Sequence, residues 1–300
     1  MDGQTFRRRH GVLKQLYQRV KDYEPFFLSP GDLQDLGIQA RQVGITDDGV
    51  LQFHPCFFRP YPERVLQKYP IATSRMTKNI SPLNRHLDFD SYLRSAHEYG
   101  NFPDALKCAI DDYALHMEIL GPDEWFSRAT DTERHIDDQI GAARKGRLKD
   151  SSLLKLGALD IMWRTKERRG EPPTSESGRP DPVWQIKNIL EDSDEKFPMP
   201  HAIMTTLAHV PANEADQSLT LHEVRAIVYM THLRTSHRPF STHPIHPLLV
   251  ISYMGQKHGR IIQASFDGKN LVLQYSQLWS FADDDTAPVE LFIRYYISQL

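Results

Sequence analysis

The stretch that decides the fold is residues 219–281, which read LTLHEVRAIVYMTHLRTSHRPFSTHPIHPLLVISYMGQKHGRIIQASFDGKNLVLQYSQLWSF. Near its start, Thr220 and Glu223 have the spacing of a capping box, in which a hydroxyl and a carboxylate each satisfy a free amide at a helix start. Apolar residues at helical spacing follow this pair. We therefore predict a helix that begins here and runs to about Leu233.

Three strands and a final helix are predicted after this helix. Leu248–Met254, Arg260–Phe266 and Leu271–Tyr275 are short segments rich in β-branched and aromatic residues. The Asp-Gly pair at 267–268 is a strong hairpin signal between the last two. A last helix is expected over Val289–Leu300. The fold class is therefore predicted as α+β, with a helix-rich N-terminal half, then a C-terminal helix and a three-stranded antiparallel meander.

The rest of the chain gives mainly helical signals. Apolar spacing predicts helices over Thr5–Asp22, Pro103–Leu120 and Leu153–Lys166. Aromatic residues and prolines crowd residues 53–70, which excludes a central strand or long helix and favours an ordered loop. Asp181-Pro182 has the form of a helix start, with proline at the first helical position.

The clearest boundary lies at residues 166–182, which read KERRGEPPTSESGRPDP. This segment combines charge, proline and glycine without an apolar anchor, so it buries too little surface to offset the entropy of ordering. We interpret it as a flexible linker, with an exposed loop inside one domain as the alternative. The predicted organisation is a helix-rich region 1–165, the linker, and an α+β domain 183–300.

The composition is that of an ordinary globular protein: 300 residues, of which 40% are hydrophobic and 25% are charged, with a formal net charge of −3. This balance gives no overall attraction to nucleic acid or to an anionic membrane. Two cysteines are too few for a disulfide framework. No apolar run approaches the roughly 20 residues that a membrane-spanning helix needs. We therefore expect a soluble protein of the cytoplasm, with the nucleus as the alternative.

Residues 224–266 form a basic island that contains no Asp or Glu but five Lys or Arg and five His. Carboxylates are common metal ligands and general bases, so hydrolytic metal chemistry is not expected here. His243 and His246 alone are too few to hold zinc, and we expect neither a metal nor a cofactor. If the island is catalytic, its candidate residues are His243, His246, His258 and Arg260, which would polarise or protonate an anionic substrate.

Other patterns that resemble catalytic motifs have simpler explanations. Asp267-Gly-Lys269 supplies half of a divalent-metal nuclease core, but the preceding strand lacks the second acid, so we interpret it as a turn. Cys108 falls in an apolar helix and Cys56 among aromatic residues, which indicates structural rather than nucleophilic roles. The sequence contains no dinucleotide fingerprint, phosphate-binding Gly-Lys loop or Gly-x-Ser-x-Gly motif.

Two basic clusters, within 144–149 and 164–169, are candidates for binding phosphate or for nuclear import. Acids at Asp150, Asp160 and Glu167 interrupt them, and aromatic stacking partners are sparse. We therefore favour solvated surfaces over a nucleic-acid interface.

Leu219–Phe281 also resembles the C-terminal segment of a large set of uncharacterised proteins from filamentous ascomycete fungi. The matching elements are the Leu-Thr-Leu-x-Glu-Val helix start, the His-x-Ile-x-Pro-Leu-Leu-Val-Ile-Ser strand and the Phe-Asp-Gly-Lys hairpin. The resemblance covers about a fifth of the chain and carries no catalytic motif. It implies a fungal source and a link to secondary-metabolite pathways, but no site residue.

Three functions remain after these observations. The first is a non-catalytic interaction or accessory protein, with the helical half presenting a surface to an unidentified protein partner. The second is a pathway enzyme that acts on an anionic or polyketide-like small molecule through the histidine and arginine residues of the island. The third is a nucleic-acid-binding protein. The missing catalytic motifs favour the first.

Overall fold

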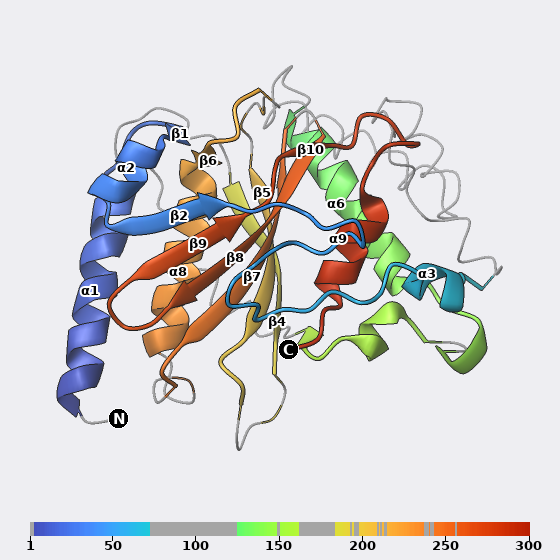
Figure 1. Cartoon of the computed structure of the whole chain (residues 1–300), viewed down its shortest axis with the longest axis horizontal. Coiled ribbons are helices and arrows are strands. Elements are labelled where there is room, and N and C mark those ends of the chain that lie inside the picture. The colour runs from blue at the N-terminus through green and yellow to red at the C-terminus, as the bar shows by residue number, and fades with distance from the viewer. Residues whose placement is uncertain are drawn as a thin grey trace, which may run out of the picture.

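The computed structural model describes residues 3–72, 125–148, 151–161, 184–192, 194, 198–208, 210, 212, 215–236, 240, 243–255 and 257–300. These residues form one large twisted β-sheet with helices on both faces (Figure 1). The helices are α1 (Gly3–Lys21), α2 (Pro30–Asp35), α3 (Val65–Lys68), α6 (Trp125–Gly141), α8 (Leu221–Ser236) and α9 (Val289–Tyr296). The strands are β1 (Phe27–Leu28), β2 (Ile38–Gln42), β3 (Asp160–Ile161), β4 (Trp184–Glu191), β5 (Ala202–Ala208), β6 (Leu219–Thr220), β7 (His246–Met254), β8 (His258–Phe266), β9 (Leu271–Tyr275) and β10 (Trp279–Ser280).

The main sheet is mixed, with the strand order β2-β9-β8-β7-β5-β4-β3, and β10 pairs with β8 off this path. The pairs β2–β9 and β5–β7 are parallel, while β8 runs antiparallel to both β7 and β9. Strands β2, β9, β7 and β5 therefore all point the same way. Their carboxyl ends lie at one edge of the sheet, which we call the carboxyl edge. Strands β1 and β6 form a separate two-stranded pair.

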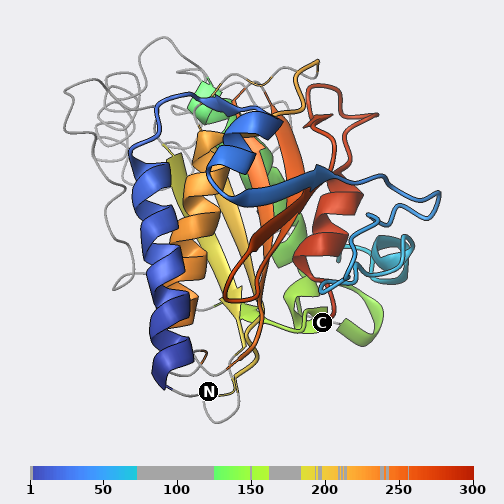
Figure 2. The same cartoon turned by 60° about the vertical axis from the view of Figure 1, so that its left-hand side comes forward.

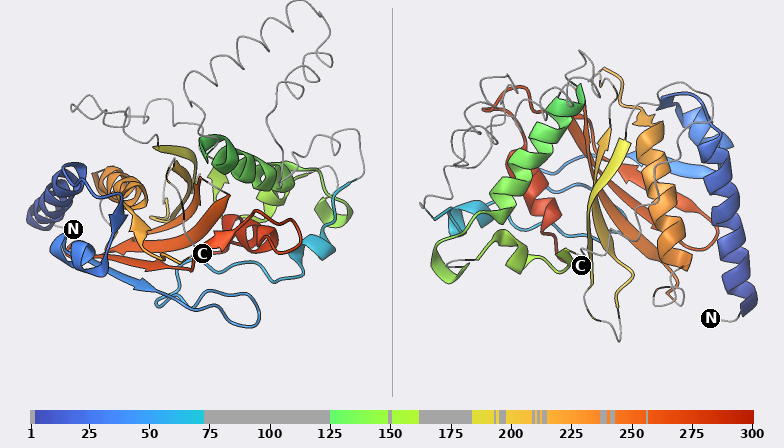
Figure 3. Two further views of the ribbon diagram at one scale, coloured as in Figure 1. Left: turned by 90° about the horizontal axis from the view of Figure 1, so that it is seen from above. Right: turned by 180° about the vertical axis from the view of Figure 1, so that it is seen from behind.

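A hydrophobic core lies on each face of the sheet. Helices α1 and α8 pack against one face, and α6 and α9 cover the other (Figures 2 and 3). Along β7, Leu248 and Val250 enter the first core, whereas Leu249 and Ile251 enter the second. A strand covered on both sides needs apolar side chains at successive positions, which explains the uninterrupted apolar run in its sequence.

The prediction of an α+β fold with a three-stranded meander is wrong. Strands β7, β8 and β9 do form antiparallel hairpins, but they are the middle of a larger mixed sheet. Strand β2 from the N-terminal half joins one side of this sheet, and β5 joins the other in parallel. The protein is therefore a mixed α/β protein with a sheet-rich C-terminal half.

Several local predictions are confirmed. Glu223 N donates to Thr220 Oγ1 (3.1 Å) and Thr220 N donates to Glu223 Oε2 (2.8 Å), so the capping box begins α8 as expected. Helix α1 occupies nearly the predicted residues, and β7, β8 and β9 contain the three predicted strands. Helix α9 is shorter than predicted because it ends at Tyr296.

Two helix predictions are wrong, and a third lies outside the described residues. The segment that follows Asp181-Pro182 is strand β4, not a helix. A register shift between Ile186 and Asn188 lets Ile186 and Ile189 face the same core although they are three residues apart, which imitates helical spacing. Leu153–Leu156 forms only a 3₁₀ turn, which is followed by β3. The helix predicted over Pro103–Leu120 and the linker 166–182 fall outside the described ranges.

The Asp-Gly hairpin is tied to the N-terminal helix by Arg9. Arg9 Nη2 donates to the carbonyl oxygen of Asp267 (2.8 Å), and Gly268 has a φ of 96°. A Cβ on Gly268 would lie 2.7 Å from Arg9 Cγ. We predict that Gly268→Ala lowers the free energy of unfolding by roughly 2 kcal/mol through backbone strain and displacement of Arg9. Urea denaturation measures this loss, and an unchanged midpoint would contradict it.

The helices in the described part of the chain do not combine the length and apolar character that crossing a membrane requires.

Candidate ligand-binding site

The four residues proposed from the basic island lie at two ends of the sheet. His243 and His246 lie before and at the start of β7, whereas His258 and Arg260 lie near the start of β8. The two strands are antiparallel, with Met254 opposite His258. A nine-residue strand at about 3.3 Å per residue separates its two ends by about 27 Å. The structure therefore does not bring the four side chains together in one site.

At the His246 end, the buried groups are held in structural contacts. His246 Nε2 lies 2.9 Å from the carbonyl oxygen of Phe240, so this nitrogen carries the proton of the ring. Burial is the main cause that lowers the pKa of His246 to about 4, which leaves the ring neutral at pH 7. The neighbouring Arg234 forms a buried ion pair with Glu191 and covers the ring of Phe240 at 4.1 Å.

A third imidazole, His201, belongs to this end of the sheet although it lies outside the island in the sequence. Burial, and then the positive charge of Arg234, lowers the pKa of His201 to about 4. Its ring meets the edge of Phe58 with the ring centroids 5.6 Å apart. Neutral imidazoles in apolar surroundings are poor proton donors at pH 7, so this cluster suits packing better than acid catalysis.

At the opposite end, Arg260 is surrounded by groups that satisfy its charge. Its Nε lies 3.2 Å from Glu223 Oε1, and its two terminal nitrogens donate to the carbonyl oxygens of Gln217 and Ser218, at 3.0 Å each. Arg260 and Glu223 are each 1% exposed. Glu223 was predicted only as part of the helix cap, but its second oxygen also pairs with Arg260. The arginine therefore joins β8 to the start of α8.

Among the described residues, no group of three or more His, Cys, Asp or Glu side chains lies close enough together to hold a metal ion. The Asp267-Gly-Lys269 pattern forms a turn, in which Asp267 Oδ1 accepts from the backbone amides of Lys269 and Asn270, each at 2.8 Å. This geometry agrees with the turn interpretation of the motif.

A buried carboxyl that sequence analysis did not single out is Glu133 of α6. It is 4% exposed, and Asn188 Nδ2 donates to its Oε1 at 3.2 Å. Burial, and then the negative charge of Asp137, raises the pKa of Glu133 to about 7. The only sequence signal for this group is an acid at an inward position of an amphipathic helix.

Within the basic cluster at 144–149, Arg144 is buried in structural contacts, whereas Lys145 and Arg147 are exposed. Arg144 is 2% exposed, and its guanidinium donates to the carbonyl oxygens of Tyr69 and Gln139. Burial lowers its pKa, but an arginine remains charged. Lys149 and the cluster at 164–169 lie outside the described ranges.

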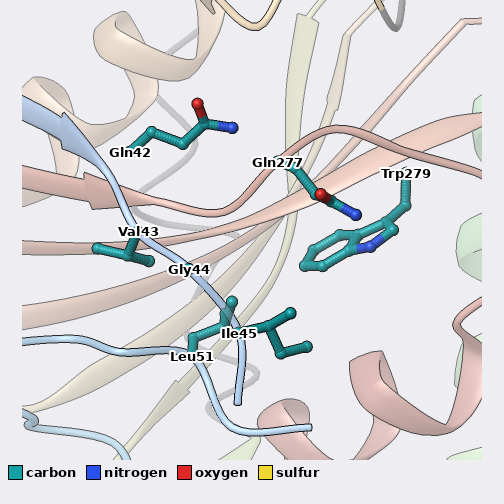
Figure 4. A pocket seen from close by; sticks show the side chains of 7 residues that line it. All are labelled: Gln42, Val43, Gly44, Ile45, Leu51, Gln277 and Trp279. Carbon is teal, nitrogen blue, oxygen red and sulfur yellow. The ribbon is translucent and has the colours of Figure 1, made fainter. Parts of the chain in front are cut away.

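A hollow of about 330 Å³ opens at the carboxyl edge, where two parallel strands separate (Figure 4). Strands β2 and β9 are paired as far as Gln42 and Tyr275, and Val43 N still donates to Tyr275 O (2.8 Å). Beyond this point, Ile45 bridges to Leu51 in a short hairpin, while the chain after β9 continues into β10 against β8. The walls of the hollow are formed by Gln42, Val43, Gly44, Ile45, Leu51, Gln277 and Trp279.

Contacts behind the lining hold the walls in place. The Trp279 ring meets the Phe292 ring edge-on, with the centroids 5.7 Å apart. On the opposite wall, Leu51 N donates to the hydroxyl of Tyr295 (2.7 Å). Gln217 joins the two walls, because its Oε1 accepts from Leu278 N (2.7 Å) and from Gln42 Nε2 (3.3 Å). The connecting segments that line the hollow are thus anchored to the sheet and to α9.

The lining combines polar amides with apolar groups and contains no reactive side chain. Two side-chain amides, an indole and aliphatic groups face the hollow, and none of the seven lining residues carries a charge, a hydroxyl or a thiol. Ile45 at its rim is 43% exposed. This site was not predicted from the sequence, because no motif marks its residues, which come from opposite ends of the described chain. Crevices outside the carboxyl ends of strands are the usual ligand sites of α/β sheets.

A comparison with protein families, with curated proteins and with solved structures finds no match to this chain.

Proposed function

We propose that the protein is a non-catalytic accessory protein that acts by binding, and that the hollow at the carboxyl edge is its binding site. The observation that carries the proposal is the lining of this hollow. It offers shape, an indole face and amide hydrogen bonds, but no acid, base or nucleophile. In small-molecule sites, a few well-placed polar groups such as these amides fix the orientation of the ligand.

The surroundings of the basic island support the same function. Arg260 and Arg234 each neutralise a buried glutamate, and His246 is bonded to a backbone carbonyl. Such groups stabilise the sheet and its helices. They are not poised to protonate a substrate, which makes the enzyme alternative the weaker of the two.

The proposal is tested by incubating the purified protein with a small-molecule extract of its native host and identifying the retained compounds by mass spectrometry. We predict that the wild type returns a retained compound with its mass unchanged. Ile45→Asp, which places a charge at the rim of the hollow, should lose the compound. Gln39→Asp, which places the same charge at an exposed position of β2 away from the hollow, should retain it.

The enzyme alternative predicts a different outcome. A compound whose mass changes on incubation, with the change abolished by His243→Ala or His246→Ala, would overturn the non-catalytic proposal. Retention by Ile45→Asp equal to that of the wild type would show that binding does not use the hollow.

The expectation of a protein partner for the helical half remains a proposal. The predicted helix of that half over Pro103–Leu120 lies outside the described residues.

A further inference from the structure

The charge of the hollow restricts what it can hold. The lining contains no Asp, Glu, Lys, Arg or His. The lining gives an ion no opposite charge to pair with, whereas a neutral molecule needs none. The lining therefore selects an uncharged ligand.

The side chains on the walls of the hollow favour a flat ligand. Figure 4 shows the indole of Trp279 on one side of the hollow and the aliphatic side chains of Ile45 and Leu51 on the other. Phe292 supports the indole from behind, so its position is fixed before any ligand enters. Aromatic rings gain from offset stacking on such a surface beyond the apolar area that they bury. A volume of about 330 Å³ is near the lower end for small-molecule pockets, which are about 300–1,000 Å³.

The two amides give the site its hydrogen-bonding pattern. The Gln42 amide is oriented by its bond to Gln217, which uses the Nε2 group and leaves Oε1 as an acceptor. Gln277 is exposed, and the structure gives its amide no hydrogen bond to the described residues. A primary amide pairs through one donor and one acceptor with a group that presents the same pair, such as a cyclic amide.

We infer that the ligand is an uncharged planar aromatic molecule that stacks on Trp279 and carries an amide-like donor and acceptor on one edge, bonded to Gln277. This inference rests on the proposed function and deepens it by naming the chemical class of the ligand. The hollow then discriminates against carboxylates of the same ring system by charge and against rings with a blocked donor by a lost hydrogen bond.

The test uses the full-length protein and three probes that share one ring system: quinolin-2(1H)-one, its 1-methyl derivative and quinoline-2-carboxylate. Dissociation constants are measured by ligand-observed NMR titration. We expect quinolin-2(1H)-one to bind about tenfold or more tightly than the carboxylate, and several-fold more tightly than the 1-methyl derivative. Trp279→Leu should weaken its binding by about tenfold or more, and Gln277→Leu by several-fold.

Gln39→Leu is the matched control, since it makes the same change at an exposed glutamine of β2 that does not line the hollow, and its affinity should equal that of the wild type. Gln277 is itself exposed, so its variant reports on binding even if Trp279→Leu unfolds the protein. Equal affinity for the carboxylate, undiminished affinity in Gln277→Leu, or no binding of quinolin-2(1H)-one would overturn the ligand class. If Ile45→Asp nevertheless fails to retain the host compound, the proposed binding function stands and only the proposed ligand class is wrong.

Discussion

Arg260→Met is expected to lower the free energy of unfolding by about 3–5 kcal/mol, because it leaves the carboxylate of Glu223 buried without its partner. Glu223 is 1% exposed, so water does not replace the lost charge. The substitution also leaves the carbonyl oxygens of Gln217 and Ser218 without their donors. Guanidinium chloride denaturation followed by circular dichroism measures the loss.

A double substitution separates the ion pair from simple packing. In Glu223→Gln/Arg260→Met the buried charge is gone, and a glutamine at this position still closes a capping box. We expect the double variant to recover at least half of the stability lost by Arg260→Met. Arg19→Met, which removes an exposed arginine, should change stability by no more than about 0.5 kcal/mol. Equal losses in the single and double variants would show that Glu223 is not the group that Arg260 neutralises.

The second large effect is expected at Glu133, whose pKa is raised from 4.5 to about 7 by burial. Between these two values the unfolded chain has released the proton while the folded protein still holds it. The contribution of this group to stability is therefore full below pH 4.5 and is lost as the pH rises toward 7. The loss amounts to about 3 kcal/mol at about 1.4 kcal/mol per pKa unit.

Glu133→Gln removes this dependence, since the amide does not ionise and its oxygen can still accept from Asn188. The variant should match the wild type at pH 4 and exceed its free energy of unfolding by about 3 kcal/mol at pH 8. Urea denaturation across this range provides the measurement, with Glu24→Gln as the exposed control. A difference between the two proteins that does not change with pH would contradict burial as the cause.

The parts of the fold that were predictable are those set by neighbouring residues. The pair Thr220 and Glu223 marks a helix start, and Asp267-Gly268 marks a turn, because each bond forms within a few positions of the chain. The sheet as a whole was not predictable. The pairing of β2 with β9 leaves no local signature, and the irregular register of β4 imitates a helix.

The candidate site was hidden for a related reason. Gln42 and Gln277 line one hollow only because β2 and β9, from opposite ends of the described chain, lie side by side. The histidines and arginines of residues 224–266 looked like a candidate site in the sequence, because no acid lies near them along the chain. In space, Glu223 and Glu191 supply the missing charges to Arg260 and Arg234.

The parallel pairing of β2 with β9 also has a consequence for how the chain reaches its native state. Arg41 and Gln274, whose side chains are bonded across this pair, are separated by 233 positions. At a synthesis rate of about 5–20 residues per second, β2 waits roughly 10–50 s on the ribosome before its partner emerges. The nascent polypeptide therefore carries an incomplete sheet through most of translation, and chaperones have a long interval in which to shield it.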